Sequence, residues 1–186
     1  MAALITTVAL AFVGYLATYV NSLRLAQRQA RLARVNLQLS DFYGPLFALT
    51  EVNGRIYDTF SAKSARADGR VPFHHDIPPT EDELAEWRTW ATTVFIPNLR
   101  AMRDVVVSKA DLLIEKEMPP VLLELCAHTS GYEITAAGWA QGNYGEHLSL
   151  IPFPGSELRE YTRDRFMLLK GEQTRLLGSG RTYLSR

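Results

Sequence analysis

The first apolar stretch of the chain carries no charged residue. It runs from Ala2 to Val20 as AALITTVALAFVGYLATYV, and the first charge follows at Arg24. A helix of about 20 residues, rising about 1.5 Å per residue, crosses the hydrocarbon core of a bilayer. No basic residue precedes the stretch, whereas a cleaved signal peptide has a positive region there. The pattern therefore predicts a retained transmembrane anchor over residues 1–23; the alternative is a buried helix of a soluble bundle, which is seldom charge-free for so long.

Four arginines and no acid follow the apolar stretch, at Arg24, Arg28, Arg31 and Arg34. Basic residues beside a transmembrane helix tend to remain in the cytoplasm, so we expect a single-pass protein with its N-terminus outside and its C-terminal domain cytoplasmic. Their spacing of four, three and three places all four on one helix face, where they could contact anionic lipid headgroups, although topology alone also accounts for them. We predict a basic juxtamembrane stalk helix over residues 24–40.

The stalk also carries a seven-residue repeat of leucine. Leu25, Leu32 and Leu39 recur at this interval with Val35 between them, a spacing that keeps one seam of a helix facing a partner helix. Gly14 lies in a stripe of small residues that allows two membrane helices to approach closely. We therefore expect the protein to form a homo-oligomer, with contacts at Gly14, Leu32, Val35 and Leu39.

The remaining sequence predicts helices and no strand of convincing length. Gly44-Pro45 suggests a bend and a new helix capped by Ser40 or Asp41, and Thr80 with Glu83 forms a capping box before another helix. Further apolar periodicity covers residues 98–117, 120–141 and 156–177, with Ser156 as a cap. We predict an all-α protein in which a transmembrane helix continues into the stalk, followed by an antiparallel bundle of about four helices at 41–178 and a tail at 179–186.

Composition and charge narrow the function without identifying it. Lys and Arg together number 20, as do Asp and Glu, so no overall excess of positive charge favours nucleic acid. The single Cys126 excludes an intramolecular disulfide, which fits a reducing compartment, and is expected to be a core thiol. We expect no nucleic-acid partner and no cofactor.

Residues 74–76 are the most ligand-like cluster in the sequence. Imidazole and carboxylate suit a transition metal, but adjacent histidines such as His74 and His75 rarely both reach one ion. Glu124 and His128 are expected to form an intrahelical pair, or His128 a satisfied core group. No motif of a catalytic nucleophile or phosphate loop is present in a suitable context. We therefore predict neither a catalytic nor a metal site, and keep one alternative, a membrane-tethered metal-dependent enzyme that uses His74 to Asp76 with Glu81 or Asp82.

Four motifs behind the N-terminal span, DFYGPLFAL, VFIPNL, EMPPVLLELCAH and SLIPFPGSELREY, resemble those of a family of uncharacterised bacterial single-span membrane proteins. The resemblance implies a bacterial inner-membrane protein with a cytosolic helical domain, and it implies no activity. We expect a membrane-anchored interaction or scaffold protein whose partners are the lipid bilayer, a second copy of the chain or another membrane protein. A sensor or effector in envelope stress or phage defence is the further alternative.

Overall fold

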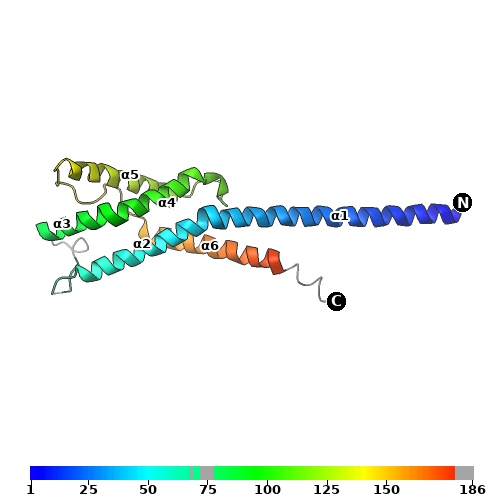
Figure 1. The fold of residues 1–186 in the computed structure, drawn as a ribbon, viewed down its shortest axis with the longest axis horizontal. Coiled ribbons are helices and arrows are strands. Elements are labelled where there is room, and N and C mark those ends of the chain that lie inside the picture. The colour runs from blue at the N-terminus through cyan, green and yellow to red at the C-terminus, as the bar shows by residue number, and fades with distance from the viewer. Residues whose placement is uncertain (68, 72–77, 179–186) are drawn as a thin grey trace.

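The protein is all-α, as the sequence predicts. A computed structural model describes residues 1–67, 69–71 and 78–178, except for the side chains of Ala2, Ala3 and Leu4, and within these ranges it contains no strand. The helices are α1 (Ala2–Gln38), α2 (Gly44–Lys63), α3 (Glu81–Trp90), α4 (Ile96–Ser108), α5 (Pro120–Ala140) and α6 (Gly155–Gly178). Figure 1 shows α1 projecting far beyond a bundle in which α2, the α3–α4 pair, α5 and α6 alternate in direction.

The first 63 residues form one almost continuous helix. Between α1 and α2 the chain makes a π-helical turn, η1 (Leu39–Tyr43), in which the Gly44 N–H donates to the Leu39 carbonyl five residues earlier. Pro45 explains the turn, because proline has no N–H and its ring displaces the carbonyl four residues before it. The predicted change of direction near Gly44-Pro45 is present in Figure 1, but the predicted cap by Ser40 or Asp41 is wrong, since helix continues through both residues.

A second proline is accommodated in the same way. The π-helical turn η2 (Ala91–Phe95) joins α3 to α4, and the Ile96 N–H donates to the Ala91 carbonyl immediately before Pro97. The two long rods of the bundle, α1–η1–α2 and α3–η2–α4, therefore stay helical through their prolines. In each rod the extra residue of the π-helical turn widens the helix immediately before the proline.

One apolar core runs through the bundle and includes the end of α1. Phe42, Tyr43 and Leu46 are fully buried at the η1 turn, where α2 packs against α4 and α6. The core also contains Val35 and Leu39 from the stalk. The bundle core is thus connected by continuous helix to the projecting part of α1.

Several helix starts and stops follow the sequence closely, but the predicted helix over 98–117 is wrong at its end, because α4 stops at Ser108 and only a 3-10 turn at Ala110–Leu112 follows. The Thr80–Glu83 capping box is present, with Thr80 N donating to Glu83 Oε2 at 2.7 Å. The α5 helix ends at Ala140 before Gly142, whose φ of 79° favours glycine. Ser156 is not a cap, because α6 begins one residue earlier and its first helical bond runs from Leu158 N to the Pro154 carbonyl.

Candidate functional site

The projecting part of α1 exposes an apolar surface. Every described side chain from residue 5 to residue 27 is exposed, and nine of them up to Val20 are large and apolar. α1 belongs to the one helix in the described part of the chain that is long and apolar enough to cross a membrane. Gly14 has no atom within 4 Å of where its Cβ would lie, so its surface is open.

The four arginines of the stalk do not share one environment. Arg28 donates to the Leu176 carbonyl at the end of α6, Arg31 pairs with Glu172, and Arg34 contacts both the carbonyl and the carboxylate of Asp111. Arg24 is exposed. Arg34 lies about 15 Å further along the helix than Arg24, so the four arginines lie at different distances from the apolar segment.

Three of these arginines line a shallow groove between α1 and α6. The groove has a volume of about 310 Å³, and its lining includes Arg24, Arg28 and Arg31 from α1 with Arg175 from α6. Glu172 is the acid beside the groove: it pairs with Arg31, and its Oε1 lies 4.0 Å from Arg175 Nη2. Positive charge therefore exceeds negative charge around the groove. We call it the arginine groove.

The leucine repeat packs largely within its own chain. Val35 and Leu39 are 3% and 9% exposed and belong to the bundle core, and Leu32 is half-buried. The heptad spacing thus coincides with the face that α1 turns toward the bundle. In this arrangement Val35 and Leu39 are not available to a second copy, which leaves Gly14 as the exposed member of the predicted oligomer contacts.

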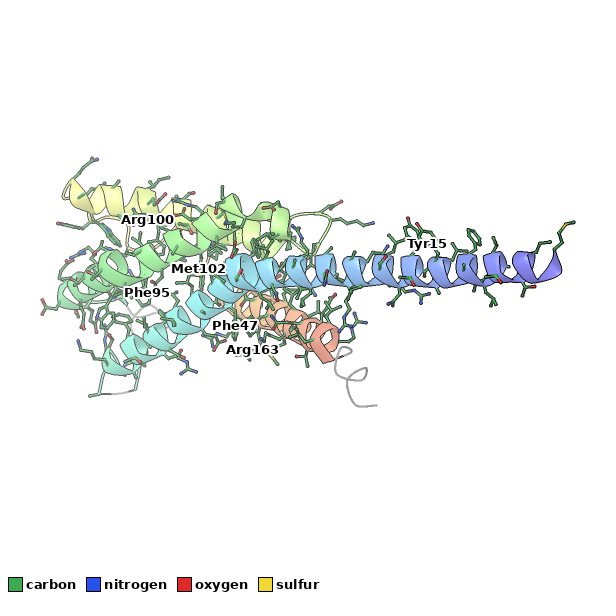
Figure 2. All side chains as sticks on the ribbon, turned by 45° about the vertical axis from the view of Figure 1, so that its right-hand side comes forward. Tyr15, Phe47, Phe95, Arg100, Met102 and Arg163 are labelled. Carbon is green, nitrogen blue, oxygen red and sulfur yellow. The ribbon has the colours of Figure 1, made fainter. Side chains whose placement is uncertain are left out.

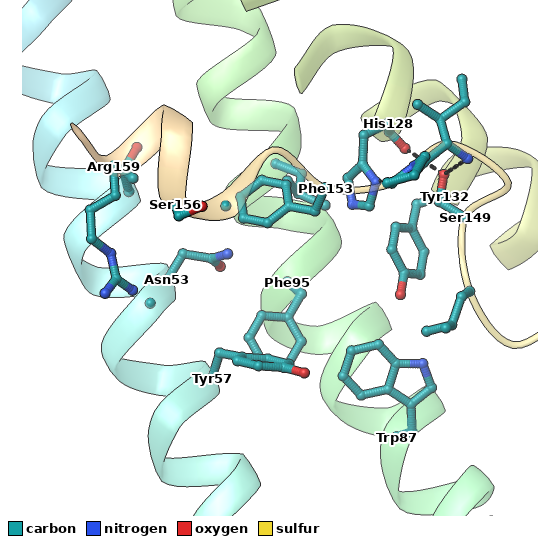
Figure 3. Close-up of a pocket in the computed structure, with 17 residues that line it drawn as sticks. Asn53, Tyr57, Trp87, Phe95, His128, Tyr132, Ser149, Phe153, Ser156 and Arg159 are labelled. Atoms are coloured by element: carbon teal, nitrogen blue, oxygen red, sulfur yellow. Dashed lines mark hydrogen bonds between the residues drawn. The ribbon is translucent and has the colours of Figure 1, made fainter. Parts of the chain in front are cut away.

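A larger cavity of about 470 Å³ lies within the bundle (Figure 3), and we call it the loop cavity. Its wall is formed by α2, α3, η2, α4, α5, the start of α6 and the loop at residues 141–154. Aromatic side chains supply much of the lining: Tyr57, Trp87, Phe95, Tyr132 and Phe153.

Hydrogen bonds from two helices hold the loop in place. Trp87 Nε1 donates to the His147 carbonyl at 2.9 Å, and Trp139 Nε1 donates to the Glu146 carbonyl at 2.7 Å. The loop approaches α5 closely at Gly131, where a Cβ would lie 2.2 Å from Ser149 Oγ and the serine side chain would have to move. These contacts therefore fix the loop as one wall of the cavity.

His128 bonds to the same loop and presents a second nitrogen. Its Nδ1 lies 2.6 Å from the Ile151 carbonyl, which can only accept, so Nδ1 carries the proton. Burial lowers the pKa of His128, which favours the neutral ring with a lone pair on Nε2. The expected Glu124–His128 pair is not formed. His128 is instead a buried core histidine whose Nδ1 is hydrogen-bonded, and this leaves its Nε2 without a bond among the described residues.

Arg159 is the charged residue in the described lining of the loop cavity. It is half-buried and makes no side-chain hydrogen bond or ion pair with the described residues. A Cβ on Gly54 would lie 1.9 Å from Arg159 Nη2, so the guanidinium rests on α2 where glycine leaves space. Neither periodicity nor any motif in the sequence indicates Arg159. The one signal is Gly54, because a glycine in the middle of a helix often marks a position where another group approaches closely.

The remaining candidates from the sequence are not assembled into a site. His74, His75 and Asp76 lie outside the described residues, so the metal-site alternative stays a prediction. In the described ranges, no group of three or more His, Cys, Asp or Glu residues is placed to hold a metal ion. Burial raises the pKa of the Cys126 thiol, which disfavours the reactive thiolate.

Comparisons of the chain with protein-family models, with curated proteins and with solved structures found no match.

Proposed function

We propose that this protein is a single-pass, membrane-anchored interaction module, in which one continuous helix holds a cytosolic helical bundle in a fixed relation to the bacterial inner membrane. The observation that carries the proposal is the run of helix from the exposed apolar surface of α1 into the bundle core. Residues 2–23 would span about 33 Å, close to the thickness of a bilayer core. Burial in lipid would remove from water an apolar surface larger than those that soluble monomers usually expose.

The proposed orientation follows from charge. All four stalk arginines lie on the C-terminal side of the apolar segment, the side that the positive-inside rule assigns to the cytoplasm. Fusions after Arg186 test this: a fluorescent protein that folds in the cytosol should be bright, and alkaline phosphatase should be inactive. Three lysines inserted after Met1 should produce mixed orientations without altering the bundle. An active phosphatase with a dark fluorescent fusion in the unmodified chain would contradict the orientation.

The arginine groove supports contact with anionic lipid headgroups at the membrane surface. Its net positive charge would attract them by about 1 kcal/mol per basic residue near the surface. The bundle in nanodiscs of phosphatidylglycerol should therefore melt at a higher temperature than in nanodiscs of phosphatidylcholine. Combined Arg24→Gln and Arg175→Gln substitutions should abolish the difference, whereas Arg100→Gln on α4 should preserve it. An equal melting temperature in both lipids would refute headgroup binding by the groove.

Self-association through the apolar segment is the second element of the proposed function. The open surface at Gly14 would let two helices approach closely. Gly14→Leu should reduce the crosslinked dimer in native membranes, while Phe12→Leu, on the other side of the helix, should not. Only monomer in the wild-type chain would exclude self-association and leave the module to act on other membrane proteins.

A further inference from the structure

We propose that the loop cavity binds a small organic monoanion, a carboxylate on an apolar body, with Arg159 pairing the carboxylate. This binding site is independent of the proposed membrane anchoring. Its volume of about 470 Å³ lies within the range of pockets that enclose small-molecule ligands. Figure 3 shows Arg159, Asn53 and Ser156 toward one side of the cavity and aromatic rings toward the other.

Three polar groups in the lining lack partners in the described part of the chain. Asn53 is 8% exposed, and its Oδ1 accepts from Asn98 Nδ2 at 3.3 Å while its Nδ2 has no acceptor. His128 is 6% exposed, and its Nε2 is left over once Nδ1 has bonded to Ile151. Among the described residues, the Arg159 side chain has no hydrogen bond or ion pair. Asn53 Nδ2 and His128 Nε2 are not sealed off from open space, so together with Arg159 they offer hydrogen-bonding groups to a ligand in the cavity.

The arrangement of these groups favours a carboxylate at the α2–α6 side of the cavity. Arg159 Nη2 lies over Gly54, the neighbour of Asn53 along α2, so a guanidinium and an amide donor come from adjacent positions. Ser156, in the first turn of α6, also lines the cavity there, where a helix N-terminus favours negative charge. A guanidinium binds a planar carboxylate through two parallel hydrogen bonds.

The charge of the lining selects a monoanion. Arg159 contributes one positive charge, the lowered pKa of His128 keeps its ring neutral, and the described lining contains no Asp or Glu. A dianion would leave one negative charge unpaired among aromatic rings, which is strongly unfavourable. The rings of Trp87, Phe95 and Phe153 would cover the apolar body of the ligand.

Calorimetric titration of the full chain in nanodiscs, with empty nanodiscs as the blank, tests the site. The probes are 2-naphthoate, its neutral amide 2-naphthamide, and decanoate as an aliphatic carboxylate. We expect saturable binding of at least one carboxylate, and naphthoate binding at least about tenfold tighter than the amide, because only the carboxylate gains the charged hydrogen bonds. Arg159→Gln should remove the preference for naphthoate.

Two further variants test whether a change in naphthoate binding comes from this site or from loss of any arginine on α6. Arg163→Gln removes another arginine of α6, one that pairs with Glu51 at 2.8 Å outside the cavity, and should leave binding unchanged. Gly54→Ala keeps every charge but occupies the space under Arg159, and should weaken naphthoate binding about as much as Arg159→Gln. Absence of saturable carboxylate binding, equal binding of amide and carboxylate, or unchanged binding by Arg159→Gln would each overturn the proposal.

Discussion

The two halves of the long N-terminal helix differ in what surrounds them, although both are rich in apolar residues. From residue 5 to residue 27 all described side chains are exposed, and Figure 2 shows them, Tyr15 included, projecting freely on all sides. From Val35 to Phe60 one face is buried against α4 and α6, and the other carries polar groups. A helix that is apolar all round needs a surrounding apolar medium, whereas an amphipathic one needs a neighbouring helix. The difference lies in the distribution of apolar residues, not in their number.

The largest effect should come from charges placed in the exposed half. Val8→Asp with Phe12→Asp adds two carboxylates near the middle of the apolar segment, each costing about 3 kcal/mol on insertion. We expect the protein to leave the carbonate-washed membrane fraction, while Val8→Leu with Phe12→Leu remains in it. Retention of the double aspartate variant would show that this half is not held by lipid.

Truncation of a ring at the start of the buried half should destabilise the bundle itself. Phe42 is fully buried, with its ring centroid 4.7 Å from that of Tyr43. Phe42→Ala should lower the free energy of unfolding by about 3–5 kcal/mol, because it leaves a cavity. Urea unfolding followed by tryptophan fluorescence measures this. Phe12→Ala, in the exposed half, should leave that transition unchanged, and an equal loss in both variants would contradict the contrast.

The junction of the two halves should be sensitive to a single methyl group. A Cβ on Gly44 would lie 2.2 Å from the Leu39 carbonyl oxygen, so Gly44→Ala must distort the π-helical turn. We expect a loss of about 1–3 kcal/mol in the same unfolding assay. Gly171, also helical but with no atom within 4 Å of its Cβ position, is the control, and Gly171→Ala should stabilise by about 0.5–1 kcal/mol. If Gly44→Ala stabilised the protein as Gly171→Ala is expected to, the π-helical turn would tolerate a side chain at residue 44 and the prediction would be wrong.

The polar link between the stalk and the end of α6 should contribute less. Arg28 Nε donates to the Leu176 carbonyl at 2.9 Å and so satisfies one of the last carbonyls of α6. Arg28→Gln should lower the free energy of unfolding by about 1 kcal/mol. Arg24→Gln, one turn earlier in the exposed half, should have no effect on unfolding, and hydrogen exchange at the end of α6 would locate the change.

The smallest expected effect is the pH dependence that His128 adds to the buried part of the molecule. Its pKa is lowered by burial, so the unfolded chain binds the proton more readily than the folded chain. Its contribution to stability is therefore fully present above the unfolded pKa of about 6.5 and is lost as the pH falls toward the folded pKa. Unfolding at pH 7.5 and 5.5 should show a steeper loss for the wild type than for His128→Gln. Equal losses of unfolding free energy in the two proteins would show that His128 does not cause the pH dependence.

Local signals in the sequence were accurate where one short segment decides the outcome. The Thr80–Glu83 box and the end of α5 before Gly142 needed only neighbouring residues. The prediction at Gly44-Pro45 failed in part for a tertiary reason. Buried contacts of Phe42 and Tyr43 favour continued helix, and a π-helical turn accommodates the proline without a break.

The sequence by itself determined the helical class, most helix boundaries apart from the end of α4, and the contrast between an all-apolar and an amphipathic segment, because periodicity and capping act over one or two turns. Only the tertiary structure decided which partner the leucine repeat faces, since Val35 and Leu39 satisfy the same spacing against another copy or against their own bundle. The loop cavity likewise unites Asn53, His128 and Arg159 from three helices far apart in the chain. No periodic pattern connects such residues, and only folding brings them to one cavity.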